Sequence, residues 1–242
     1  MNLIIDIGNT FVKFAVFQLD KIEYKCVFEL ENFEKEFQQI LKTYPKINKS
    51  IISSVGALKE TSLNMVKNRL KTVELNHNTS LPFSNLYETP KTLGVDRIAL
   101  VCASVAQFPN NNVLIIDAGT CMTFDFVNKN NAYLGGAISP GIRMRYKSLN
   151  NLTAKLPLLD TQLPNNITGN STANAIHSGV VNGILNEING IVNQYQEKYS
   201  DLTVILTGGD AKFLSKQLKN GIFANYNFLL EGLNFILEFN SN

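Results

Sequence analysis

The chain of 242 residues has little of what builds metal centres or disulfide frameworks. It contains three cysteines, Cys26, Cys102 and Cys121, and two histidines, His77 and His177. Because the cysteines are odd in number, widely spaced and without a CxxC pair, they argue against a disulfide framework or a zinc site. The histidines are too few for a typical histidine-rich metal centre. We therefore expect a protein of the reducing cytoplasm.

Charge and long apolar runs are also scarce. Charged residues make up 17% of the chain, against about 25% in typical soluble domains. A net charge of +2 gives no electrostatic reason to expect nucleic acid or a membrane surface as a partner. No segment reaches the roughly 18 apolar residues that span a bilayer, and the N-terminal segment 1–10 lacks the basic start of a signal peptide. The 45% hydrophobic content still predicts a folded chain with a sizeable core.

The apolar pattern predicts strands and helices along the whole chain. Strands are expected within 2–19 (two, around a tight turn), 21–30, 50–55, 112–127 (two), 132–138 and 202–206. Helices are expected at 33–44, 61–70, 93–108, 172–195, from about 210, and at 228–239, with a loop at 150–170. This order of elements indicates an α/β protein.

The opening pattern of the chain returns in its middle. NLIIDIGNTFVKFAVF at 2–17 is matched by NVLIIDAGTCMTFDFV at 112–127, and Asp6 and Asp117 lie 111 positions apart. That period is too long for a solenoid repeat. We interpret the match as an internal duplication and predict two related halves, 1–110 and 111–242, each with one strand–turn–strand corner.

Both corners have the chemistry of a phosphate-binding loop. Backbone N–H groups and a threonine hydroxyl can bind phosphate oxygens, while the aspartate carboxylate suits a cation or its water shell. No GxxxxGK[ST] or GxGxxG motif is present, which argues against P-loop and Rossmann sites. One corner alone is better explained as a hairpin whose aspartate caps the turn. Two matching corners favour a pair that holds one polyphosphate from two sides.

An ordered set of motifs resembles the type III pantothenate kinases, within the superfamily of actin, the heat-shock chaperone ATPases and sugar kinases. The motifs are DxGNTxxK at 6–13, GxDR at 94–97, DxGTAxTxD at 117–125, GGxIxPG at 135–141, TAKLP at 153–157, GxxT at 169–172 and TGG at 207–209. Cys121 replaces the usual alanine of the third motif. The resemblance implies two actin-like, ribonuclease H-like halves, with mixed sheets flanked by helices and a nucleotide cleft between them. The TGG turn is then expected beside the adenosine, although a plain strand-to-helix turn explains it as well.

The resemblance also implies an activity. It is the ATP-dependent phosphorylation of pantothenate at its primary hydroxyl to 4′-phosphopantothenate, the first step towards coenzyme A. A homodimer and a monovalent cation, K⁺ or NH₄⁺, are implied as well, and Mg²⁺ is expected to accompany ATP. Two alternatives stay open: a kinase of the same superfamily for another small hydroxylated acceptor, and a nucleotide-binding regulatory protein without catalysis. The intact Asp96 argues against the second.

Carried over residue by residue, the resemblance assigns site roles. The residues expected around the nucleotide phosphates are Asp6, Ile7, Gly8, Asn9, Thr10, Phe11, Val12 and Lys13, with Thr120 as a further ATP contact. The residues expected at pantothenate are Tyr87, Gly94, Val95, Asp96, Arg97 and Thr172. Asp96 corresponds to the proton acceptor, and Asp117 to the ligand of the monovalent cation.

The chemistry of these residues is compatible with the roles. A carboxylate can accept the proton of a hydroxyl nucleophile, and at the start of the helix predicted at 93–108 the dipole favours an ionised Asp96. The planar guanidinium of Arg97 can bind the pantothenate carboxylate or a phosphate oxygen. A solvated pair at a helix start is the alternative. Lys13 can neutralise phosphate charge or point into solvent.

Overall fold

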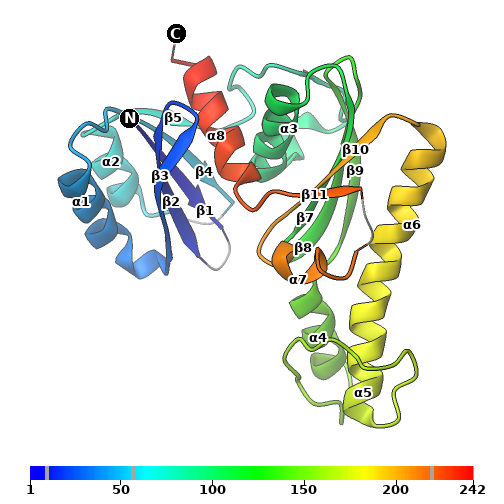
Figure 1. The fold of residues 1–242 in the computed structure, drawn as a ribbon. Coiled ribbons are helices and arrows are strands. Elements are labelled where there is room, and N and C mark those ends of the chain that lie inside the picture. Colours follow the sequence, from blue (N-terminus) through cyan, green and yellow to red (C-terminus); the bar gives the residue numbers. More distant parts are fainter. Residues whose placement is uncertain (9–10, 56–57, 219–220, 242) are drawn as a thin grey trace. The chain divides into compact units, whose positions relative to one another are not determined.

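The computed structural model describes residues 1–8, 11–55, 58–218 and 221–241, and the chain divides into two compact units (Figure 1). Unit 1 comprises Met1–Pro109, Asn131–Tyr133 and Asn227–Asn242, and unit 2 comprises Asn110–Asn130 and Leu134–Tyr226. The predicted halves 1–110 and 111–242 differ from these units at Asn110, which belongs to unit 2, and in the segments 131–133 and 227–242, which belong to unit 1. Where one functional half ends and the other begins stays a prediction.

Unit 1 is a five-stranded mixed sheet with helices. Its elements are β1 (Asn2–Ile7), β2 (Val12–Gln18), β3 (Lys21–Phe28), α1 (Phe33–Thr43), β4 (Lys49–Ser54), α2 (Glu60–Lys67), β5 (Lys71–Glu74), β6 (Ser84–Asn85), α3 (Val95–Gln107) and α8 (Phe228–Phe239). The strand order is β3-β2-β1-β4-β5, in which β2 runs antiparallel to β1 and β3, while β4 and β5 are parallel to β1. Every residue of β1 is buried, as its apolar sequence NLIIDI requires of a central strand.

The core of unit 1 lies mainly between this sheet and helices α1 and α2. Leu3, Ile5 and Phe14 of the strands pack in one cluster with Phe33 and Phe37 of α1. The C-terminal helix α8 packs on α3, where a Cβ at Gly232 would lie only 2.0 Å from the Ala99 carbonyl oxygen. The close approach of the two backbones explains why the end of the chain belongs to unit 1.

Unit 2 contains the second sheet. Its elements are β7 (Asn112–Ala118), β8 (Cys121–Val127), β9 (Ala132–Pro140), α4 (Ile142–Asn151), α5 (Thr172–His177), a π-helical turn (Ser178–Asn182), α6 (Gly183–Lys198), β10 (Leu202–Thr207), α7 (Ala211–Leu214) and β11 (Ile222–Ala224). The strand order is β11-β10-β7-β8-β9. Strand β8 is antiparallel to β7, and β10 and β11 follow in parallel. The first two residues of β9 lie in unit 1 and pair in parallel with β6.

The two sheets share one strand order, which supports the predicted duplication. In each, a hairpin carries an aspartate next to the end of its first strand, and a later strand joins that strand in parallel. Asp6 lies opposite Lys13 in the first hairpin, and Asp117 lies opposite Thr123 in the second. The predicted α/β class with mixed sheets and flanking helices is confirmed.

Some elements differ from the prediction. Helix α4 follows Pro140 and Gly141 and was not predicted, because its sequence IRMRYKSLNN buries only Ile142 and Tyr146. The helix predicted at 172–195 is interrupted by the π-helical turn. The short strands β5, β6 and β11 were not predicted either. Of the helices in the described ranges, none combines the length and apolar character that crossing a bilayer requires.

Candidate functional site

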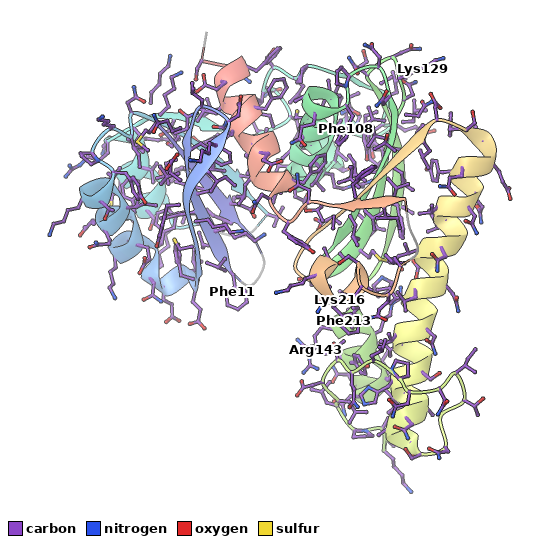
Figure 2. The ribbon with its side chains drawn as sticks, in the orientation of Figure 1. Phe11, Phe108, Lys129, Arg143, Phe213 and Lys216 are labelled. Carbon is purple, nitrogen blue, oxygen red and sulfur yellow. The ribbon has the colours of Figure 1, made fainter. Side chains whose placement is uncertain are left out.

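The first corner joins β1 to β2 at the edge where β1 ends. The Gly8 N–H donates to the Phe11 carbonyl at 3.0 Å and closes the turn. Ile7 and Val12 are buried in the paired strands. Phe11 is 47% exposed, and Figure 2 shows its ring at the tip of the hairpin. The predicted phosphate contacts Asn9 and Thr10 lie outside the described residues.

Asp6 and Lys13 form an ion pair on this corner. The Lys13 Nζ lies 3.2 Å from Asp6 Oδ2, and the side chains are 45% and 7% exposed, respectively. Burial raises the pKa of the Asp6 carboxyl above its ordinary value, the Lys13 ammonium opposes this, and the charge of Asp96 adds to it. The Lys13 side chain therefore does not simply point into solvent, because its ammonium lies beside the buried Asp6 carboxylate. Its exposed part remains accessible to a ligand.

Asp96 lies in the first turn of α3, also in unit 1. Its Oδ1 accepts the backbone N–H of Arg97 at 2.8 Å. The N-cap residue is Gly94, and a Cβ there would lie 2.3 Å from Asp96 Oδ1. The carboxylate thus occupies the space that any larger residue at 94 would fill, which gives the glycine of the GxDR motif a physical reason.

The two carboxylates of unit 1 are near enough to interact. The charge of Asp96 acts on Asp6 and disfavours its ionised form. The first corner and the start of α3, 90 positions apart in the sequence, therefore lie within electrostatic range of each other. That arrangement could place a phosphate group bound by the corner beside a carboxylate able to take a proton.

Arg97 projects from the same helix turn into an aromatic cluster. Its side chain is buried, and the guanidinium carbon lies 5.6 Å from the centre of the Tyr87 ring and 6.0 Å from that of Tyr133. The structure thus brings together the predicted substrate residues Tyr87 and Arg97. Sequence reasoning missed Tyr133. Its only signal was its place two positions before the GGxIxPG segment.

The second corner, in unit 2, joins β7 to β8. The Gly119 N–H donates to the Cys121 carbonyl at 3.0 Å, and Thr120 at the tip is exposed. The TGG turn packs directly on this corner, since a Cβ at Gly208 would lie 2.4 Å from Asp117 Oδ1. Gly208 has a φ of +97°, a conformation that favours glycine. The turn and the corner, 91 positions apart from Asp117 to Gly208, thereby form one surface.

The Asp117 carboxylate and the Ala118 carbonyl both lie beside Gly208, where a Cβ would come within 2.4 Å of Asp117 Oδ1 and 2.5 Å of the Ala118 oxygen. The Ala118 carbonyl also accepts the Asp210 N–H at 2.9 Å. Carboxylate and carbonyl oxygens are the donors that hard cations prefer. In the described ranges no group of three or more His, Cys, Asp or Glu side chains could hold a metal ion. A cation here would thus depend on carbonyl or phosphate oxygens beside Asp117.

Two further motif segments lie in unit 2. The N–H of Gly141, the N-cap of α4, donates to the Thr120 carbonyl at 3.2 Å. The end of the GGxIxPG motif therefore supports the second corner. Thr172, predicted to contact pantothenate, is exposed as the first residue of α5, where the Ser171 hydroxyl caps the helix. Its role stays a prediction, as do the roles of all the other predicted site residues.

Comparisons with known proteins agree on one family. A family model described as type III pantothenate kinase matches residues 2–194. A type III pantothenate kinase of Christiangramia forsetii is 52% identical over 240 residues, which cover 99% of each chain.

Two solved structures extend the comparison. One, titled as a conserved Baf family transcriptional activator from Campylobacter jejuni, has a TM-score of 0.63 and 25% identity, with 98% of each chain covered. The other, a glucokinase from an Antarctic psychrotroph, has a TM-score of 0.53 and 15% identity, again with 98% of each chain covered. The second likeness shows the fold alone, and it confirms the predicted actin-like, sugar-kinase architecture.

Proposed function

The chain belongs to the type III pantothenate kinase family, and from this premise we propose how its residues carry out the reaction. It is a phosphotransferase that uses ATP to phosphorylate pantothenate in coenzyme A biosynthesis. One observation carries the assignment of roles: Asp96 lies at the start of α3, within electrostatic range of the Asp6–Lys13 pair. We propose on this basis that a proton acceptor and a phosphate-binding corner share one site in unit 1.

In the proposed step, Asp96 accepts the proton of the primary hydroxyl of pantothenate. The hydroxyl oxygen forms a bond to the γ-phosphorus while the bond from that phosphorus to the bridging oxygen of ADP breaks. Asp96 ends protonated, and ADP leaves with the electron pair of the broken bond. The role of the chain is mostly to position the reactants and neutralise charge, as is usual in phosphoryl transfer.

We propose that each corner binds nucleotide phosphates. The Lys13 ammonium neutralises phosphate charge, and the backbone of the first corner supplies N–H donors. On the second corner, Thr120 is an exposed hydroxyl next to the TGG turn, which offers bare backbone to the adenosine. The matched strand orders of the two sheets support this pairing of roles.

A cation at the second corner fits the residues present. The Asp117 carboxylate offers an oxygen donor, and the Ala118 carbonyl, which accepts the Asp210 N–H, lies near it beside Gly208. We propose that Asp117 holds K⁺ or NH₄⁺, which supplies positive charge for the phosphates. Mg²⁺ is proposed to arrive with ATP, bound through phosphates and water.

The remaining proposals concern the acceptor and the assembly. Arg97 binds the carboxylate of pantothenate, with Tyr87 beside it and Thr172 as a further contact. A homodimer is supported by exposed apolar side chains on unit 2, including Ile138 on β9 and Ile167, which are 64% and 81% exposed. Three free cysteines support a cytoplasmic location.

The test is a coupled assay of ADP release with a panel of acceptors, run with and without K⁺. We expect release that depends on pantothenate and not on sugars, and that K⁺ increases. ADP release with a sugar in place of pantothenate would favour the sugar-kinase alternative. ATP binding without any acceptor-dependent turnover would favour the regulatory alternative.

A further inference from the structure

Tyr133 is a buried tyrosine beside the proposed acceptor residues, and no role proposed above includes it. Its side chain is 0% exposed. Its ring centre lies 6.0 Å from that of Tyr87, with the planes inclined by 31°. The Arg97 guanidinium is within cation–π range of both rings, at 5.6 Å from Tyr87 and 6.0 Å from Tyr133. A single guanidinium thus contacts two aromatic rings.

Backbone hydrogen bonds fix this arrangement. The Leu86 N–H donates to the Tyr133 carbonyl at 3.0 Å, and the Ser84 N–H donates to the Asn131 carbonyl at 2.9 Å. The Phe83 ring packs edge-on against Tyr133, at 6.3 Å and an interplanar angle of 75°. Segment 131–133 is in this way held in unit 1 beside Tyr87. Because Tyr133 is packed on several sides, it can act as a rigid support for Arg97.

We propose that Tyr133 is a positioning residue that orients the Arg97 guanidinium towards the carboxylate of the acceptor. It thereby gives the site its preference for a carboxylate-bearing substrate. The inference rests on the proposed function, in which Arg97 binds that carboxylate. A planar guanidinium forms two parallel hydrogen bonds with a carboxylate only in a narrow range of orientations. If the guanidinium is already held in that orientation before the substrate arrives, less conformational entropy is lost when the carboxylate binds.

The test compares two acceptors in the ADP-release assay: pantothenate, and pantothenyl alcohol, which carries a hydroxyl in place of the carboxylate. In Tyr133→Met, the new side chain fills most of the volume of the tyrosine but has no aromatic ring, whereas Tyr133→Phe keeps the ring. We expect Tyr133→Met to raise the KM for pantothenate about tenfold with kcat little changed. Tyr133→Phe should keep the wild-type KM for pantothenate. In both variants the KM for the alcohol should equal that of the wild type.

A double-mutant cycle separates positioning from packing. In an Arg97→Met background, Tyr133→Met should cause no further loss with pantothenate, because the group through which it acts is gone. Phe37→Leu serves as the matched control, since it removes an equally buried ring from α1, and thermal unfolding is followed for every variant. Tyr133→Leu is a second ringless variant in case Tyr133→Met does not fold.

An equal rise in KM for both acceptors would overturn the inference, and so would a Tyr133→Phe variant as impaired as Tyr133→Met. A wild-type chain that releases no ADP with pantothenate would instead overturn the proposed function. The two failures are therefore distinguishable in the same assay.

Discussion

Replacing Gly94 by alanine should displace the Asp96 carboxylate while leaving the fold intact. The added Cβ would lie 2.3 Å from Asp96 Oδ1, whereas ordinary contact begins near 3.4 Å. The clash is relieved only if the two atoms separate by about 1 Å. The Asp96 carboxylate is the group that moves, because a side chain rotates more easily than the backbone shifts. Gly94 has φ −59° and ψ 137°, which alanine adopts without strain.

The expected consequence is a loss of kcat that far exceeds the loss of stability. A misplacement of about 1 Å at a reacting group can reduce the rate about a hundredfold. Alanine at a helix N-cap should reduce the free energy of unfolding by only about 1 kcal/mol. The measurement is kcat at saturating ATP and pantothenate, together with thermal unfolding.

Gly190→Ala is the matched control, because Gly190 lies within α6 and a Cβ there meets nothing within 4 Å. It should keep kcat and stabilise the chain by about 1 kcal/mol. If Gly94→Ala retains the wild-type kcat, the position of the Asp96 carboxylate does not matter, and the reasoning that makes it the proton acceptor is wrong.

Three further substitutions test the site. Asp96→Asn should lower kcat by about a hundredfold or more with folding retained, and near-normal phosphorylation by a folded variant would refute the general-base role. Asp6→Asn tests the raised pKa of the buried Asp6 carboxyl. The protonated carboxyl stabilises the folded chain, and this stabilisation is lost as the pH rises through the pKa of the folded state. The free energy of unfolding of the wild type should therefore fall relative to that of the variant as the pH rises. An opposite trend in the unfolding temperatures would mean that Lys13 outweighs burial. Gly208→Ala should lower both the stability and the activation by K⁺, because alanine would have to adopt a φ of +97° and its Cβ would clash with Asp117. Unchanged K⁺ dependence in a folded variant would exclude this turn from the cation site.

The strands that carry the site were predictable from the sequence. The apolar runs at 2–7 and 112–118 are buried on both faces, and buried central strands read as continuous apolar segments. The duplicated corner was visible because the aspartate, glycine and threonine recur in the same order. The match in strand order between the sheets then follows from the same repeat.

Other features depend on contacts between distant segments. Tyr133 lies 36 positions from Arg97, and the pairing of β6 with β9 places Tyr133 beside the segment that leads to Tyr87. Nothing in the sequence of α8 indicates which unit it packs on, since an apolar helix can cover either sheet. Helix α4 buries only Ile142 and Tyr146, so the helical period of apolar residues in its sequence is weak.

The central claim is that both corners bind nucleotide phosphates, and hydrogen exchange measured with a slowly hydrolysed ATP analogue tests it most directly. Peptides covering 6–13 and 117–125 should both become protected, with the same half-saturating concentration of the analogue. Protection of one corner alone, or protection of the two at clearly different concentrations, would contradict the account.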